Sequence, residues 1–362
     1  MTPRARFWTF AGLVAVTVAF GAFGALRTAR VTLSGQYGYV PDPDGTREFL
    51  SELTQPTFAE AGRDSMAQAK GVDTFLYRFT DRAHREVYGE PWQCWDQGDV
   101  GTCVSMAFGL GCQTAMAVDW DVSSGKGAQP PPAVATEPIY GGSRTAGRMP
   151  PIAFNGGGDG SYGGAAARWI SGQCKVEGIG GVLFRQKYPQ ADLTSYSKSL
   201  SRDWGRSGVP QPLAIKANEV RMMAVAQINT WAEFCASIER GSPVVLCSTV
   251  GYGRWDGSNP QRDSQGFLPR GKSWAHAMLA WGVRHAKPGD PSSRDGGLIQ
   301  NSWSKRWCGG PKWPADQPDG SFWGSRADIE AALAQGDSFA IGKANFKWRQ
   351  LDNRVWFQKE RR

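Results

Sequence analysis

Four side chains in this sequence are of the types that catalysis by a thiol nucleophile requires. Gln97 and Cys103 lie in the motif DQGDVGTC, His276 lies in WAHA, and Asn301 lies in QNSW. A thiol becomes a strong nucleophile when a base holds it as thiolate, and that base needs a third group to fix its ring. The oxyanion formed by attack on a carbonyl also needs hydrogen-bond donors. The sequence therefore contains every group type that acyl transfer through a cysteine needs.

These residues, in this order, resemble the motifs of the papain-like cysteine peptidases, which read roughly N-Q-G-x-x-G-x-C, H-A-V and K-N-S-W. The resemblance implies that Cys103 is the nucleophile, His276 the imidazole and Asn301 the amide that orients it. Gln97, six positions before the cysteine, matches the oxyanion-hole glutamine. Trp303 matches the indole that shields the Asn–His hydrogen bond from water. The resemblance covers roughly residues 91–346.

The resemblance implies an α+β fold of two lobes, with a long central helix in one, an antiparallel β-barrel-like sheet in the other, and a cleft between them. The residue pattern agrees, since it is helical in the first half and strand-rich in the second. A central helix is expected to begin at Cys103, where the helix dipole would favour the thiolate. Predicted helices cover 104–118, 231–240 and 326–335, and predicted strands cover 243–250, 274–283, 297–301 and 338–346.

Two positions that carry a disulfide in the family are apolar in this chain. Val100 stands where one cysteine is expected, and Phe154 stands where its partner is expected, in a loop that reads FNGG. The sequence therefore predicts that packing between Val100 and Phe154 replaces the bridge. Val104, directly after the nucleophile, is a further departure that bears on substrate preference.

The N-terminus carries one uncharged apolar run, residues 7–26, within a segment of residues 1–30. Twenty helical residues span about 30 Å, the thickness of a bilayer core. The run is either an uncleaved anchor with its N-terminus inside or the apolar part of a signal peptide. Both interpretations place the body outside the cytoplasm, membrane-anchored or secreted. The six cysteines other than Cys103 would then be able to form up to three disulfides, with the pairing open.

The remaining chain divides into three parts by composition. Residues 31–90 are interpreted as a linker and possible pro-like segment, 91–348 as the catalytic domain, and 349–362 as a basic tail. The net charge of +8 suits an acidic partner or surface. Because the basic residues are scattered and many lie at the chain ends, no nucleic-acid partner is expected.

Two glycine-rich stretches match the residue patterns of cofactor-binding motifs but lack the structural context that these motifs require. Residues 266–273 (GFLPRGKS) match the P-loop, but the preceding segment is polar and a strand is expected to follow. Residues 158–163 match a dinucleotide fingerprint without a βαβ repeat. With only three histidines and no zinc-type cysteine spacing, no metal and no cofactor is expected.

The sequence thus predicts a cysteine endopeptidase acting on a polypeptide or peptide substrate. Two alternatives stay open: a cell-wall peptide hydrolase or amidase that uses the same site, and a non-catalytic binding module on the same fold. The complete Cys–His–Asn–Gln set argues against the binding module, because a non-catalytic protein with this fold would need none of these groups.

Overall fold

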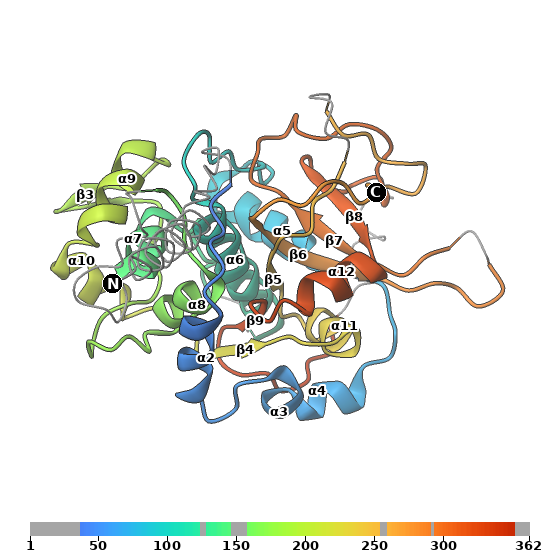
Figure 1. The fold of residues 1–362 in the computed structure, drawn as a ribbon, viewed down its shortest axis with the longest axis horizontal. Coiled ribbons are helices and arrows are strands. Elements are labelled where there is room, and N and C mark those ends of the chain that lie inside the picture. The colour runs from blue at the N-terminus through green and yellow to red at the C-terminus, as the bar shows by residue number, and fades with distance from the viewer. Residues whose placement is uncertain (1–36, 124–127, 146–157, 254–258, 291–292, 352–362) are drawn as a thin grey trace, which may run out of the picture. The chain divides into compact units, whose positions relative to one another are not determined.

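Helix α6 (Cys103–Ser123) is the central element of the fold. The computed structural model describes residues 37–123, 128–145, 158–253, 259–290 and 293–351, and these belong to one compact unit. Helix α6 is buried along most of its length because its residues are apolar or small on every side, as expected for a helix enclosed by other elements. It packs against helices on one side and against the sheet on the other (Figure 1).

The sheet is antiparallel throughout and contains seven strands. Its order is β4-β9-β5-β6-β7-β8, and β1 adds to β6. In the described part of the chain this sheet is open rather than closed into a barrel, with β4 and β8 as its edge strands. Isolated bridges to Thr57 and Phe267 cover parts of these two edges. The strands are β1 (Thr74–Phe75), β4 (Ala224–Gln227), β5 (Val244–Ser248), β6 (His276–Arg284), β7 (Gly296–Gln300), β8 (Ser321–Ser325) and β9 (Phe339–Gly342).

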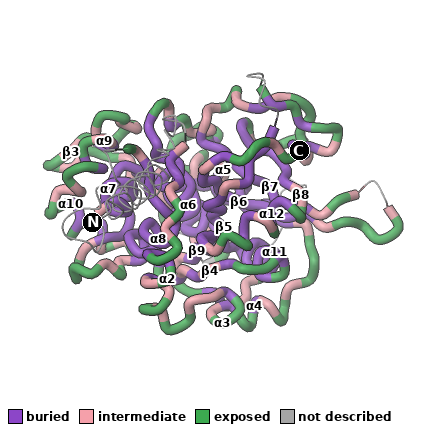
Figure 2. The backbone as a smooth tube through the Cα atoms, in the orientation of Figure 1, coloured by how far each residue is buried: buried purple, intermediate pink, exposed green. Residues whose placement is uncertain are grey.

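Strands β5, β6 and β7 are buried at every position, so their runs are mostly apolar or small rather than alternating (Figure 2). Helix α6 covers one face of these strands, and α11 (Trp231–Glu239) and α12 (Arg326–Leu333) also pack on the sheet. The N-caps predicted for the last two helices are present. Thr230 accepts from the Glu233 N–H, and Ser325 accepts from the Asp328 N–H.

The other lobe is built mainly from helices. Helix α7 packs against α8 and α9, and a short hairpin of β2 and β3 connects this region to α9. Its elements are α7 (Glu137–Thr145), α8 (Gly163–Ser171), β2 (Lys187–Tyr188), β3 (Ala191–Asp192), α9 (Lys198–Ser207) and α10 (Gln211–Ala217). A helical lobe and a sheet lobe joined along α6 give the α+β architecture that the sequence predicts.

Most of the segment predicted as a linker is built into the body. Helix α2 packs on α8, α4 packs on α11, β1 pairs with β6, and α5 packs on α6. The fully buried side chains Phe49, Phe58 and Phe79 anchor this region. Its helices are α2 (Pro43–Ser51), α3 (Phe58–Ala61), α4 (Arg63–Gln68) and α5 (Tyr77–Tyr88). The described stretch before α2, residues 37–42, contains no helix and no strand beyond an isolated bridge at Tyr39.

Several predictions concern residues outside the described part of the chain. These are the apolar run 7–26, the tail beyond residue 351, and the contact of Val100 with Phe154. Among the described residues, no helix combines the length and apolar character needed to cross a bilayer. All seven cysteines are described, and each is a free thiol in the structure, so none of the disulfides allowed by the sequence is formed there.

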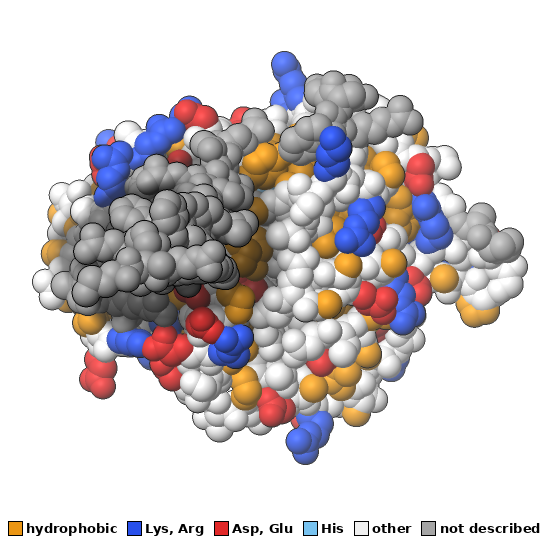
Figure 3. All heavy atoms as spheres, viewed as in Figure 1, with side chains coloured by type: hydrophobic (Ala, Val, Ile, Leu, Met, Phe, Trp, Pro, Cys, Tyr) orange, Lys and Arg blue, Asp and Glu red, His pale blue; other side chains and the backbone are white. Residues whose placement is uncertain are grey.

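Charged side chains are distributed without a dominant sign over the visible face. Lys and Arg are interspersed with Asp and Glu on the described surface (Figure 3). Many are paired locally, as in Lys198–Asp99 and Arg294–Asp263. This face therefore carries no basic stripe of the kind that follows a nucleic-acid backbone.

Candidate active site

Cys103 is the first residue of α6, and its side chain is completely buried. The helix dipole favours its thiolate, as the sequence predicts, but burial outweighs that effect and raises the pKa of the Cys103 thiol to about 11. Backbone groups of Ala277, Gly38 and Val104 lie against the thiol and oppose the shift. In this arrangement the thiol keeps its proton at neutral pH.

His276 opens strand β6, and Asn301 directly follows the neighbouring strand β7, so the sheet register brings the two together. The Asn301 Oδ1 atom lies 2.8 Å from His276 Nε2. The same oxygen accepts the Ser302 backbone N–H at 2.7 Å, which identifies it as an acceptor. The proton therefore lies on His276 Nε2, and Nδ1 carries the lone pair.

His276 Nδ1 is buried without a hydrogen-bond partner among the described residues. Burial lowers the pKa of His276 to about 4, opposed by the hydrogen bond to Asn301. The imidazole is therefore neutral near pH 7. A neutral ring with a free lone pair is ready to accept a proton, but it does not yet form an ion pair with the thiol.

Aromatic rings surround the His276–Asn301 hydrogen bond. The Trp303 ring lies 4.3 Å from the His276 ring, centroid to centroid, with 34° between their planes. Trp274 packs edge-on against Trp303 at 5.0 Å, and Trp307 does so at 5.5 Å. These indoles shield the hydrogen bond from water. The resemblance implied this shielding role for Trp303.

Gln97 connects the cysteine loop to the asparagine loop. Its side chain is fully buried, its Nε2 donates to Val100 O at 2.9 Å, and its Oε1 accepts from Ser302 Oγ at 2.7 Å. Its backbone N–H donates to Ser302 O at 2.9 Å. The predicted oxyanion donor is thus beside the Cys103 loop, with an amide N–H bonded to a backbone carbonyl.

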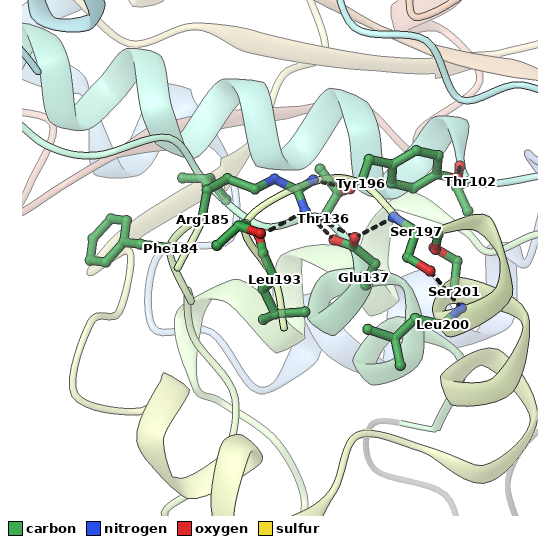
Figure 4. Close-up of polar contacts among 12 residues, drawn as sticks. Thr102, Thr136, Glu137, Phe184, Arg185, Leu193, Tyr196, Ser197, Leu200 and Ser201 are labelled. Atoms are coloured by element: carbon green, nitrogen blue, oxygen red, sulfur yellow. Dashed lines mark hydrogen bonds and ion pairs between the residues drawn. The ribbon is translucent and has the colours of Figure 1, made fainter. Parts of the chain in front are cut away.

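A partly buried ion pair in the helical lobe supports this loop (Figure 4). Arg185 Nη1 contacts both carboxylate oxygens of Glu137, at 2.9 and 2.8 Å, and Glu137 also accepts the Ser197 N–H at 2.8 Å. The adjacent Tyr196 hydroxyl lies 3.0 Å from Thr102 Oγ1, next to the nucleophile. The sequence gives no sign of this set, because no motif marks it and its members are far apart in the chain.

Residues 37–40, here called the covering segment, lie across the site. The Tyr39 N–H donates to Ala275 O at 3.3 Å on the sheet lobe. On the helical lobe, the Val40 N–H donates to Ser161 O at 2.9 Å, and the Ser161 N–H donates to Gly38 O at 2.8 Å. Tyr39 thus pairs in parallel with Ser161. The segment bridges both lobes in front of α6 (blue in Figure 1), as a bound strand would.

The covering segment also shields the two candidate catalytic groups. The Tyr37 ring stands edge-on to His276 at 6.3 Å and to Trp303 at 5.5 Å. Gly38 passes so close to Gly101 that a Cβ on it would lie 2.6 Å from the Gly101 Cα. The sequence pattern indicates that the glycines of this stretch are linker residues, but Gly38 is required here by the close approach of two backbones.

No protein-family model and no curated protein matches this sequence. Among solved structures, the chain is similar to xylellain, a cysteine protease from Xylella fastidiosa, with 17% identity, 86% of this chain and 98% of that chain covered, and a TM-score of 0.53. It also aligns with proCathepsin B S9 from Trypanosoma congolense, at 11% identity, 91% and 97% coverage and a TM-score of 0.47. A third match is digestive procathepsin L 3 of Tenebrio molitor larval midgut, at 13% identity, 91% and 89% coverage and a TM-score of 0.42.

This chain has the papain-like fold. The predicted fold is therefore confirmed, with an open sheet in the second lobe. Within this papain-like fold, the candidate residues lie at the junction of the lobes, with Cys103 contributed by α6 and His276 and Asn301 contributed by the sheet.

The two cofactor-like motifs hold no phosphate site. Residues 266–273 form a loop in which Phe267 bridges to Trp323, and strand β6 rather than a helix follows. Residues 158–163 do precede α8, but the Gly163 and Gly164 N–H groups donate to the Asp337 carboxylate at 2.7 and 2.8 Å. An anion at this helix N-terminus would meet a carboxylate of the protein already in place.

Proposed function

We propose that the chain is a cysteine peptidase that hydrolyses peptide bonds through Cys103, His276, Asn301 and Gln97. The observation that carries the proposal is the shielded hydrogen bond from His276 Nε2 to Asn301 Oδ1, which leaves Nδ1 as a base without a hydrogen-bond partner among the described residues. The next residue, Ala277, lies with its backbone against the Cys103 thiol. A structural histidine would have no need of an orienting amide and an unpaired ring nitrogen. That arrangement suits a base that must accept and return a proton.

In the proposed reaction His276 Nδ1 removes the thiol proton, and Cys103 Sγ attacks the carbonyl carbon of the substrate. The tetrahedral oxyanion takes the Cys103 N–H and a Gln97 amide N–H, which exchanges its bond to Val100 O. Collapse breaks the C–N bond, and the proton passes from His276 to the leaving amine. Water, deprotonated by His276, then attacks the thioester, releases the carboxylic acid and restores the thiol.

We further propose that the protein is latent while the covering segment is in place. The segment occupies the backbone hydrogen-bonding groups of Ala275 and Ser161, so a substrate strand cannot pair with the same groups. Burial also keeps both Cys103 and His276 neutral, with pKa values of about 11 and about 4. Displacement of the segment would let water reach both groups and bring their pKa values together. The proposed pro-like role therefore applies to the residues before α2, whereas residues 43–88 are part of the body of the fold.

The location of the body is a separate proposal. The apolar run 7–26, flanked by arginines, supports export with either an uncleaved anchor or a cleaved signal. Fractionation of cells with protease added to intact spheroplasts tests it. A protease-accessible body is expected, and a body that stays protected would refute the orientation.

An epoxide-type thiol inhibitor tests the catalytic proposal, with the adduct located by mass spectrometry. In protein whose covering segment has been displaced, the adduct is expected on Cys103. Peptide hydrolysis is expected to be lost as the adduct forms. Cys103→Ala and His276→Ala are expected to abolish turnover. Cys174→Ala is the matched control, because Cys174 is a partly exposed thiol that follows α8 in the helical lobe and is not one of the candidate residues. Full peptidase activity in Cys103→Ala would refute the proposed mechanism.

A further inference from the structure

A cavity of about 300 Å³ lies in the helical lobe, where α7 and α9 pack against each other (Figure 1). A volume of this size is at the lower end of the range for small-molecule sites. None of the described residues that line it belongs to the covering segment, so that segment does not form its wall. The lining residues define what is called here the arginine cavity, and they are Tyr140, Arg144, Asp159, Arg202, Gly205 and Arg206.

Arg144 is the buried cation of this wall, with 5% of its surface exposed. Its Nε donates to Gly205 O at 2.7 Å, and its Nη1 donates to Gly160 O at 2.7 Å. Gly205 allows α9 to come this close, because a Cβ there would lie 2.7 Å from the Tyr140 ring. A guanidinium held by two main-chain carbonyls is already ordered, so it loses little conformational entropy when it binds an anion.

The other two cations come from one face of α9. Arg202 and Arg206 are four residues apart, which places them next to each other on the helix surface, where like charges are unfavourable. Arg206 is exposed and makes no hydrogen bond or ion pair with the described residues. Arg202 Nη2 lies 3.0 Å from Asp99 Oδ2, but Asp99 is 67% exposed and also contacts Lys198 Nζ at 2.8 Å. An exposed pair of this kind contributes little, so Arg202 can turn to a ligand at little cost.

Asp159 is the one carboxylate among the described residues that line the cavity. Both of its oxygens accept hydrogen bonds from the protein, Oδ2 from the Gly101 N–H at 3.3 Å and Oδ1 from the Tyr140 hydroxyl at 3.4 Å. Three arginines against one carboxylate leave the lining with a net charge of +2. The cavity therefore has a surplus of hydrogen-bond donors and of positive charge.

The larger cavity of the sheet lobe, about 740 Å³, does not have this surplus among its described lining residues. Arg294 there pairs with Asp263, and Arg270 lies 3.7 Å from Asp328. Two cations and two carboxylates leave no net charge to attract an anion. The surplus is thus particular to the arginine cavity and does not follow simply from the presence of arginines in a cavity.

We propose that the arginine cavity is a binding site for a small organic anion with two negative charges, carried on carboxylate or phosphate groups. Two charges would neutralise the lining, and guanidinium groups match the geometry of both carboxylate and phosphate oxygens. The site is additional to the proposed peptidase chemistry, because Cys103 and His276 do not line it.

Isothermal titration calorimetry of the full-length protein tests the site without turnover. Glutarate and phenyl phosphate are titrated separately at constant ionic strength, and glutaramide is the neutral counterpart of glutarate. Arg206→Gln removes an exposed arginine and no internal contact, and it is expected to weaken binding of the anion about tenfold through loss of a charge-assisted hydrogen bond. Arg63→Gln is the matched control, because Arg63 is an exposed helical arginine in α4.

The site is supported if either anion binds, glutaramide does not, and only Arg206→Gln weakens the affinity. The anion that binds more tightly then identifies the preferred group. Equal weakening by Arg206→Gln and Arg63→Gln would overturn the site, because it would show general attraction to a chain of net charge +8. No binding of either anion at about 10 mM, tenfold above a millimolar Kd, would overturn it as well.

Cys103→Ala separates the arginine cavity from the catalytic residues. This variant is expected to bind the anion as tightly as the unmodified protein, because the thiol does not line the cavity. Loss of binding in Cys103→Ala would place the anion at the candidate active site and overturn the proposal. Neither result depends on whether the protein hydrolyses peptides.

Discussion

Gly38→Ala should activate the protein, because Gly38 is the point at which the covering segment passes closest to the nucleophile loop. A Cβ added there would lie 2.6 Å from the Gly101 Cα and closer still to the Gly101 carbonyl. Ordinary contacts are about 3.5–4.0 Å. The obstacle is backbone, so no side-chain rotation relieves the overlap. The segment must therefore move.

Overpacking of this kind costs about 1–3 kcal/mol. Since about 1.4 kcal/mol changes an equilibrium tenfold, the uncovered population should rise roughly 5- to 150-fold. The alkylation rate of Cys103 reports that population when opening and closing are fast compared with labelling. The rate is measured by mass spectrometry of the Cys103 peptide, with peptide hydrolysis as a second readout.

Gly158→Ala is the matched control. A Cβ at Gly158 meets no atom within 4 Å, and the residue lies in the loop that faces the covering segment. Its labelling rate should equal that of the unmodified protein. If Gly38→Ala is folded and labels no faster than Gly158→Ala, the segment does not control access to Cys103, and the proposed latency is wrong.

Three further outcomes are expected. Labelling of Cys103 in the covered protein should rise about tenfold per pH unit between about pH 6 and 9, because its thiol pKa is about 11 and the thiolate fraction is still small there; a plateau below pH 8 would show that burial does not set this pKa. Gln97→Ala should lower kcat by roughly 10²–10³ through loss of an oxyanion donor, with little change in thiol labelling, and an unchanged kcat would remove Gln97 from the mechanism. Glu137→Gln should lower the free energy of unfolding by about 1.5–3 kcal/mol in a urea titration, because it removes charge-assisted hydrogen bonds between the fully buried Glu137 and the partly exposed Arg185; a loss below about 1 kcal/mol would mean that this ion pair does not support the site.

The sequence identifies the groups that carry the proposed chemistry because catalysis restricts residue type. A thiol, an imidazole and two amides have no common substitutes in this reaction, so their joint order along the chain is informative by itself. The long apolar stretch after Cys103 also predicts α6, since a helix buried on all sides leaves a clear signal. Strand β6 is predicted for the same reason, and its first residue is His276.

Only the tertiary structure shows what surrounds those groups. The pKa values of Cys103 and His276 depend on burial by a segment that lies more than sixty residues before the cysteine, and no local pattern encodes that burial. Asp337 gives no signal either, because a carboxylate after a helix is ordinarily a solvated turn residue. The physical reason for this lack of a local signal is the way in which the covering segment is held. The covering segment is held by backbone hydrogen bonds to Ala275 and Ser161, and backbone groups are the same in every residue. The sequence specifies which side chains are present, but long-range backbone pairing decides which of them are enclosed, and enclosure sets their charge and their access to substrate.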